Sequence, residues 1–233
     1  MATVYLIPAP LDEAVLNTLP VYIREAVFAC DTFFIENERT TRRYFKKMDS
    51  SIVIDDYTWV VMKEVTGEVR EQFIQHVKQN KTIGIVSEAG CPGIADPGQE
   101  LVALAHQMKA TVKPLVGPSS ITLALMASGF NGQQFSFQGY LPVEDNERTK
   151  KIKQLEALSA QTGATQIFIE TPYRNHKLLE NILKACHPAT RLCVAVDITS
   201  PQEQIISMSV SDWKKSDLQL HKRPAIFLMY KVK

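Results

Sequence analysis

Short runs of β-branched residues alternate along this chain with segments of helical periodicity. Residues 3–7 and 82–86 are the clearest strands, and between them Val69, Phe73 and Val77 recur every four residues, as on one buried face of a helix. Such β-α repetition favours parallel strands, because a helix between two strands carries the chain back to its starting edge. The sequence therefore predicts an α/β fold with a largely parallel sheet.

The alternation is interrupted once, at Val116-Gly117-Pro118, and we place a domain boundary there, between domains of residues 1–116 and 117–233. The other strands expected in the N-terminal domain are residues 33–36, 51–54 and 111–115. In the C-terminal domain we expect strands at residues 135–140, 166–170 and 192–196. Residues 203–210 and 225–230 then follow as neighbouring strands with a short connection. This pattern predicts an antiparallel pair and a mixed sheet in the C-terminal domain.

Composition excludes several classes of protein. The 233 residues carry a net charge of only +1, from 26 Lys plus Arg against 25 Asp plus Glu, so a polyanion site must be local. The four cysteines form no C-x-x-C pair and the five histidines no cluster, so we expect no metal. No apolar run approaches the length of a membrane span, and no basic region leads the apolar start, so we expect a cytoplasmic protein without membrane attachment.

The segment SEAGCPGIADPG, residues 87–98, lies directly after the strand at 82–86 and before an amphipathic helix that includes Leu101 and Leu104. Three glycines and two prolines predict a shaped loop at the carboxyl end of a strand, where open α/β sheets bind ligands. The alternative is a tight connection in which Asp96 accepts hydrogen bonds from nearby backbone. The segment is neither a G-x-G-x-x-G fingerprint nor a P-loop.

A basic stripe is expected on a helix within ENERTTRRYFKKM, residues 36–48. Its cations recur at the spacing of one helix face and are Arg39, Arg42, Arg43, Lys46 and Lys47. Such a face can neutralise phosphates of an RNA, although most charge runs are only solvated surface.

Two further segments hold candidate residues. Ser119 and Ser120 come where a helix begins, so their role is either N-capping or binding of a ligand oxygen. Glu170 and Arg174 flank a turn through Pro172, where they form either a structural ion pair or a pair that orients substrate.

Seven blocks in order resemble the tetrapyrrole methylase superfamily, on the branch that methylates a ribose 2'-oxygen of small-subunit ribosomal RNA. The blocks are VYLIPAP, ENERTTRRYF, SEAGCPGIADPG, VGPSSITLALMASG, FSFQGYLP, IFIETPYR and RPAIFL. The resemblance implies two α/β domains with S-adenosylmethionine in the cleft between them, and a homodimer that acts in rRNA processing.

The resemblance also implies roles for individual residues. The implied cofactor wall is Pro8, Gly90, Cys91, Gly93, Ile94, Ser119, Ser120, Ile169, Glu170, Pro224 and Ala225. The implied substrate side holds the catalytic candidates Glu36, Arg39, Asp96 and Arg174. A carboxylate among them is expected to take the hydroxyl proton, and orientation to supply most of the acceleration.

The chain departs from this branch mainly in the substrate half. The loop at residues 8–13 lacks the glycine that the branch has after its Pro-x-Pro, Glu88 stands where the branch has Asp, and Asp197 lies in a shortened form of the branch's Arg-Glu-x-Thr-Lys pattern. Two alternatives therefore stay open. One is a methyltransferase of the same fold acting on a corrin, a porphyrin or another small molecule, and the other is a cofactor-binding paralogue without catalysis.

Overall fold

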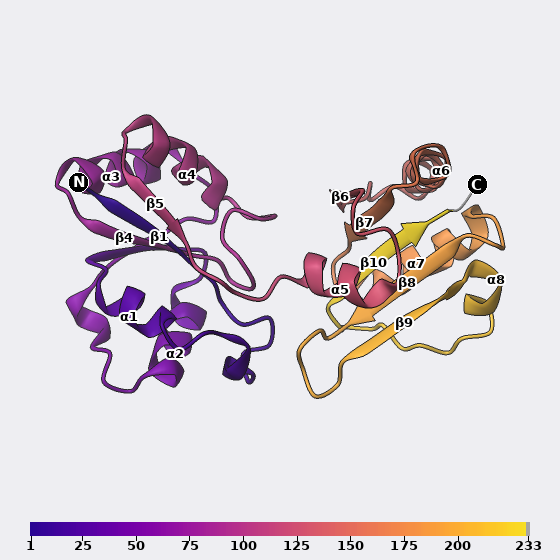
Figure 1. Ribbon diagram of the computed structural model, residues 1–233, viewed down its shortest axis with the longest axis horizontal. Helices are drawn as coiled ribbons and strands as arrows, with labels where there is room; N and C mark the ends of the chain where they lie inside the picture. The colour runs from indigo at the N-terminus through magenta and orange to yellow at the C-terminus, as the bar shows by residue number, and fades with distance from the viewer. Residues whose placement is uncertain (232–233) are drawn as a thin grey trace. The chain divides into compact units, whose positions relative to one another are not determined.

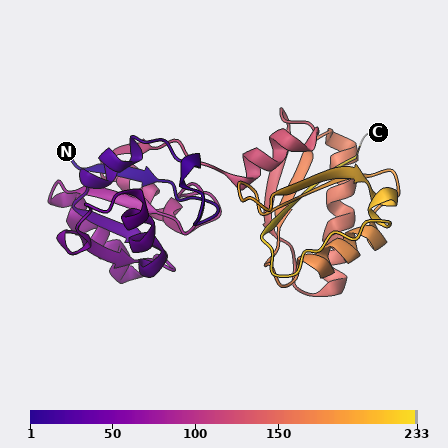
Figure 2. The ribbon, with the colours of Figure 1, turned by 90° about the horizontal axis from the view of Figure 1, so that it is seen from below.

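The computed structural model describes residues 1–231, and these form two compact units, Met1–Ser119 and a second that begins at Ser120. Each unit contains one five-stranded sheet with helices packed against it (Figures 1 and 2). The predicted α/β class, with a parallel and a mixed sheet, is confirmed.

The sheet of the first unit is entirely parallel, in the order β3-β2-β4-β1-β5. Its strands are β1 (Thr3–Ile7), β2 (Thr32–Ile35), β3 (Thr58–Val61), β4 (Thr82–Val86) and β5 (Thr111–Pro114). All their carboxyl ends therefore lie at one edge, and the loops that leave this edge form the candidate site.

Helices cover both faces of this sheet. One face packs against α3 (Gly67–Lys78) and α4 (Gly98–Gln107), and the other against α1 (Ile23–Phe28) and α2 (Glu38–Met48) (Figure 1). Phe73 and Leu101 fill the first layer, and Phe33 and Phe45 meet edge to face in the second, with ring centroids 4.9 Å apart. Short 3-10 turns occupy Leu16–Thr18 and Ile54–Asp56.

The second unit has a mixed sheet in the order β6-β7-β10-β8-β9. Its strands are β6 (Phe135–Tyr140), β7 (Thr165–Ile169), β8 (Arg191–Val196), β9 (Gln204–Ser209) and β10 (Ala225–Tyr230). Only β6 and β7 pair in parallel, and β10 runs antiparallel to both β7 and β8. The end of β7 and the start of β10 are therefore adjacent.

Four helices accompany this sheet: α5 (Ser120–Ser128), α6 (Asp145–Thr162), α7 (Asn175–Ala185) and the short α8 (Val210–Trp213). The main core lies between the sheet and α6, α7 and α8, where Phe168 stacks on Phe227 with centroids 6.0 Å apart. The indole N–H of Trp213 donates to the Leu192 carbonyl at 2.8 Å. On α5, the Ser128 carbonyl accepts from Ser207 of β9 at 2.8 Å.

Two local predictions were wrong. The third strand is β3 and not residues 51–54, because Val53 is exposed and a 3-10 turn starts at Ile54. The strands β9 and β10 are not neighbours, because β8 lies between them and pairs with both.

On α6, the Arg148 side chain is only 3% exposed, and Ile152 is fully buried. Arg148 forms an ion pair with Asp145 and donates to the Val143 carbonyl at 2.8 Å. This buried cation therefore fixes the start of α6 against the loop that precedes it.

Candidate active site

The glycine-rich loop after β4 has a fixed shape. Gly90 has φ = 77° and Gly93 φ = 82°, in the left-handed region that side chains with a Cβ rarely adopt. The Asp96 Oδ1 atom accepts the N–H groups of both Gly93 and Gly98 at 2.8 Å. One carboxylate oxygen of Asp96 therefore stabilises the loop's own backbone, whether or not Asp96 also takes part in catalysis.

The loop after β1 pairs with this glycine-rich loop. Ala9 and Gly90 form an antiparallel bridge, with N–H to carbonyl distances of 2.9 and 3.0 Å. The Tyr44 hydroxyl, from α2, donates to the Pro8 carbonyl at 2.9 Å. The first unit therefore brings Pro8 and Gly90 together at the carboxyl edge of its sheet.

The segment after β5 completes this group. The Cys91 thiol lies 3.6 Å from the Gly117 carbonyl and 3.4 Å from the Pro118 carbonyl. A Cβ on Gly117 would lie 2.1 Å from the Pro8 Cβ, so only glycine allows this approach. Burial raises the pKa of the Cys91 thiol, with a further contribution from the Asp96 carboxylate, so the thiol is protonated at neutral pH.

The predicted cofactor residues of the first unit thus belong to three loops at one edge of the sheet: Pro8, Gly90, Cys91, Gly93, Ile94 and Ser119. Ile94 is half exposed. The sequence reasoning did not select Gly117 or Tyr44 as site residues. A glycine followed by a proline in the loop after a predicted strand is a signal for Gly117, whereas nothing in the sequence links Tyr44 to Pro8.

Two carboxyl groups, Glu36 and Asp96, lie close enough at this edge to influence each other. The Glu36 Oε1 atom accepts the Glu88 N–H at 2.9 Å. Burial raises the pKa of Glu36, and the Asp96 and Glu88 carboxylates raise it further, against the opposing effect of that hydrogen bond. Burial likewise raises the pKa of Asp96, whose Oδ2 atom is buried without a hydrogen-bond partner. Both are thus more basic than free carboxylates.

The other two catalytic candidates are not in this group. Arg39 is exposed in the first turn of α2, where its backbone N–H donates to the Asn37 side chain at 3.1 Å. Within residues 1–231 the Arg39 guanidinium forms no ion pair. Arg174 belongs to the second unit.

Five of the predicted cofactor residues belong to the second unit: Ser120, Ile169, Glu170, Pro224 and Ala225. Ser120 begins α5, while the other four lie where β7 ends and β10 begins, with Ile169 opposite Ile226. The Glu170 Oε1 atom accepts from the Thr171 N–H and from Arg174 Nη2, both at 2.7 Å.

Glu170 and Arg174 therefore form the predicted ion pair across the turn. The Glu170 side chain has no exposed surface, and its Oε2 atom is buried without a partner, as is Oδ1 of Asn175. Two acceptor oxygens at this edge are thus unsatisfied, and groups of this kind usually bind a water or a ligand donor.

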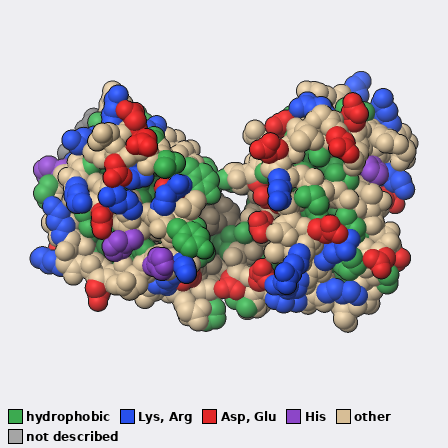
Figure 3. Space-filling model, turned by 180° about the vertical axis from the view of Figure 1, so that it is seen from behind, with side chains coloured by type: hydrophobic (Ala, Val, Ile, Leu, Met, Phe, Trp, Pro, Cys, Tyr) green, Lys and Arg blue, Asp and Glu red, His purple; other side chains and the backbone are tan. Residues whose placement is uncertain are grey.

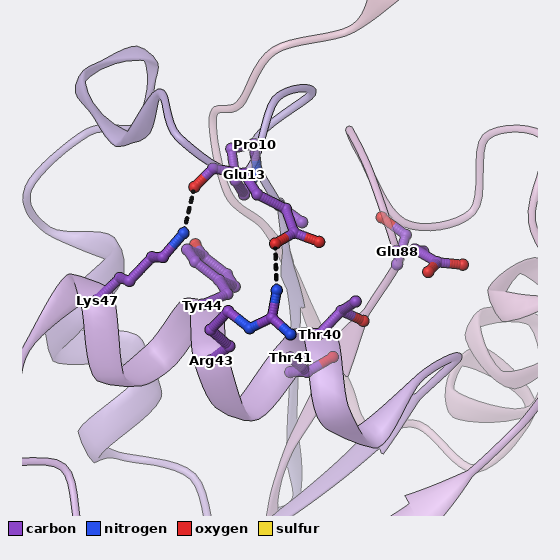
Figure 4. Close-up of a pocket in the computed structure, with 10 residues that line it drawn as sticks. Pro10, Glu13, Thr40, Thr41, Arg43, Tyr44, Lys47 and Glu88 are labelled. Carbon is purple, nitrogen blue, oxygen red and sulfur yellow. Dashed lines mark hydrogen bonds and ion pairs between the residues drawn. The ribbon is translucent and has the colours of Figure 1, made fainter. Parts of the chain in front are cut away.

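The predicted basic helix forms as α2, with Tyr44 and Phe45 buried, but most of its cations have partners. Arg42 pairs with Glu38 at 2.5 Å and lies over the Trp59 ring, and Lys46 donates to the Ser50 carbonyl at 3.0 Å. Two others, Arg43 and Lys47, line a pocket with Pro10, Glu13, Thr40 and Glu88 (Figure 4). On the face drawn in Figure 3, cations and carboxylates are interspersed, as expected from a net charge of +1.

Among the described residues, no group of three or more His, Cys, Asp or Glu side chains is arranged to hold a metal ion. In the same part of the chain, no helix has the length and hydrophobicity to cross a membrane.

A family model described as "Tetrapyrrole (Corrin/Porphyrin) Methylases" matches residues 3–213. The ribosomal RNA small subunit methyltransferase I of Vibrio cholerae serotype O1 is 26% identical over 229 residues, which are 97% of this chain and 76% of that protein. Proteins of the same name from Bacillus subtilis and Halalkalibacterium halodurans are 29% and 30% identical, over 93% and 78% of this chain. The chain spans 72% and 59% of their lengths.

The fold is also found in solved structures. Uroporphyrin-III-C-methyltransferase from Thermus thermophilus superposes with a TM-score of 0.59 at 16% identity, covering 99% of this chain and 92% of that one. A structure of the uroporphyrin-III C-methyltransferase of the same organism, complexed with S-adenyl homocysteine, gives a TM-score of 0.59 at 13% identity, covering 99% and 98%. At these identities the likeness concerns the fold alone.

Proposed function

Since the chain belongs to the tetrapyrrole (corrin/porphyrin) methylase family, we propose that it is an S-adenosylmethionine-dependent methyltransferase that methylates a ribose 2'-oxygen of small-subunit ribosomal RNA. The relatives named as ribosomal RNA small subunit methyltransferases support RNA as the acceptor. The structural observation that carries the proposal is the meeting of the loops after β1, β4 and β5 around Gly90 and Gly117.

The residues of the first unit fit the cofactor. The loops that contain Pro8, Gly90, Cys91 and Gly93 present backbone amides and small side chains, which suit a nucleoside that must be enclosed closely. When bound, S-adenosylmethionine supplies an activated methyl group on a sulfonium. No metal is needed for such a transfer.

The second unit has buried hydrogen-bond acceptors without donors at the turn after β7. The buried Glu170 Oε2 and Asn175 Oδ1 atoms lack donors, and the hydroxyl and amino groups of S-adenosylmethionine are donors. The proposed cofactor residues there are Ser120, Ile169, Glu170, Pro224 and Ala225.

Glu36 and Asp96 are the candidates to accept the proton of the ribose hydroxyl. Such a carboxylate would hold the proton that the ribose hydroxyl loses when its oxygen is methylated. Their raised pKa values make both stronger bases than a free carboxylate, and a positioned base of this kind contributes about 10²–10⁴-fold. Arg39 and Arg174 are proposed to orient the RNA.

The RNA-binding surface is proposed to include the α2 cations Arg39, Arg42, Arg43, Lys46 and Lys47. The proposal includes the homodimer that the family resemblance implies, which light scattering after gel filtration tests. It also includes a cytoplasmic location, where ribosomal RNA is the available substrate.

The proposal is tested with radiolabelled S-adenosylmethionine and small ribosomal subunits from a strain that lacks this protein. We expect label in the RNA fraction, and less label with subunits from the parent strain, which are already methylated. Label found only in small molecules of a cell extract would support the corrin or porphyrin alternative. Binding of the cofactor without methyl incorporation into any fraction would indicate a non-catalytic paralogue.

A further inference from the structure

The pocket beside α2 differs from the rest of the helix surface because two cations meet there. Arg43 and Lys47 are one helical turn apart and lie on the same side of α2, facing the loop after β1 (Figure 4). The guanidinium of Arg43 matches the oxygens of a phosphate in two-pronged geometry, and Lys47 adds a compact positive charge. The pair therefore has the chemistry of a phosphate site.

One residue, Glu13, now engages both cations. Its carboxylate Oε2 atom lies 2.9 Å from Arg43 Nη1, and its backbone carbonyl accepts from Lys47 Nζ at 3.0 Å (Figure 4). Glu13 thus presents an anionic oxygen and a carbonyl oxygen to the positions where two phosphate oxygens would bind.

The ion pair between Arg43 and Glu13 is easily replaced by another anion. The Arg43 and Glu13 side chains are 44% and 55% exposed, and solvated pairs of this kind contribute little to stability. The pairs of the neighbouring cations lie outside this pocket, because Arg42 binds Glu38 and Trp59.

The pocket is fixed to the loops of the candidate active site. Tyr44, between the two cations on α2, donates to the Pro8 carbonyl at 2.9 Å, and Ala9, Ser87 and Glu88 line the same pocket. A phosphate at Arg43 and Lys47 would therefore lie against the loops after β1 and β4, close to the residues proposed for catalysis and not at a remote surface.

We propose that Arg43 and Lys47 bind one backbone phosphate of the RNA substrate, and that Glu13 occupies this site until the phosphate displaces it. This inference rests on the proposed function, because it takes RNA as the ligand. It adds a specific binding site for one phosphate, and it makes Glu13 an internal competitor that lowers the affinity for RNA.

The test compares Glu13→Gln with Glu38→Gln. Both substitutions remove one negative charge beside an α2 arginine, but only Glu13 lines the pocket. Binding of a labelled single-stranded RNA is measured by fluorescence anisotropy at several salt concentrations. We expect Glu13→Gln to tighten binding about two- to five-fold, the range for one exposed ion pair, and Glu38→Gln to change it less.

The cations provide the second half of the test. Arg43→Gln and Lys47→Gln should each weaken RNA binding, and the variant with both substitutions should lose about 0.7 from the slope of log affinity against log salt, the value for one phosphate contact on a single strand. In the variant that carries both substitutions, the effect of Glu13→Gln should disappear. Circular dichroism checks that each variant is folded.

The outcomes separate this inference from the proposed function. Equal effects of Glu13→Gln and Glu38→Gln would overturn the phosphate site, even if ribosomal RNA is methylated. A gain with Glu13→Gln that persists without both cations would overturn it as well. Tighter RNA binding by Glu13→Gln, without any methylation of ribosomal RNA, would support the phosphate site and reject the proposed function. A gain for inorganic phosphate but not for RNA would reject RNA as the ligand.

Discussion

Gly117 is the residue at which the segment after β5 comes closest to the loop after β1. An added Cβ would lie 2.1 Å from Cβ and 2.5 Å from Cγ of Pro8, well inside the contact distance of two carbon atoms. Both loops are backbone segments next to a proline, so neither can move without shifting its neighbours. The contact therefore depends on the missing side chain.

We expect Gly117→Ala to lower the free energy of unfolding by about 1–3 kcal/mol, the usual cost of overpacking, and to weaken S-adenosylmethionine binding. Urea unfolding and titration calorimetry measure the two effects. Gly67→Ala is the matched control, because a Cβ there meets nothing within 4 Å at the start of α3. If Gly117→Ala bound the cofactor as tightly as Gly67→Ala, these loops would not form the cofactor site.

Asp96 supports a prediction about pH. Burial raises the pKa of its carboxyl above the ordinary value of 3.8, so the folded protein holds this proton more tightly than the unfolded chain does. The protonated group therefore adds stability below about pH 3.8, and this contribution is lost as the pH rises through the folded-state pKa.

Asp96→Asn keeps an oxygen for the Gly93 and Gly98 N–H groups but removes the buried charge. Its stability relative to the wild type should be higher at about pH 7 than at about pH 3, as measured by urea unfolding at both values. If Asp96 accepts the substrate proton, methyl transfer should fall about 10²–10⁴-fold in the same variant. Unchanged methyl transfer would leave Glu36 as the proton acceptor.

The helix α2 links the proposed proton acceptor Glu36 to the proposed RNA-binding surface, because it starts beside Glu36 and carries the cations. Asn37 caps it, with Oδ1 accepting from the Arg39 and Thr40 N–H groups at 3.1 and 3.3 Å. Thr66 caps α3 in the same way, through the Val69 N–H at 3.3 Å.

We expect Asn37→Ala and Thr66→Ala each to cost about 1 kcal/mol of stability, but only Asn37→Ala to weaken RNA binding as well. The reason is that loss of the cap frays the first turn of α2, next to Arg39. Thermal unfolding and RNA anisotropy are the two measurements. An equal effect of both substitutions on RNA affinity would show that α2 does not contact RNA.

Elements with strong periodicity could be predicted from the sequence. Val69, Phe73 and Val77 identified α3, and the β-branched run at Thr82–Val86 identified β4. The prediction missed β3 because the apolar residues within 51–54 resemble a short strand, although only Ile52 among them is buried. The position of β3 is fixed instead by its pairing with β2. The position of β8 between β9 and β10 is a choice of strand order, which no local pattern encodes.

At the scale of the whole molecule, the family resemblance predicts which loops form the site, but the contacts between these loops could not be predicted. Glu13 meets Arg43 and Glu36 meets Glu88 because strand order brings distant segments to one edge of the first sheet. The sequence shows five cations at helical spacing, and only the structure shows that two of them share a pocket with Glu13. The candidate residues Glu170 and Arg174 likewise belong to a separate unit with its own sheet.

The most direct test of the methyltransferase assignment is nucleoside analysis of the product. Small-subunit ribosomal RNA from a strain that lacks this protein is incubated with the purified chain and S-adenosylmethionine carrying a labelled methyl group. The RNA is digested, and its nucleosides are separated by mass spectrometry. The account predicts label in one 2'-O-methylated nucleoside. Label on a base, or no label in any nucleoside while a small molecule is methylated, would contradict it.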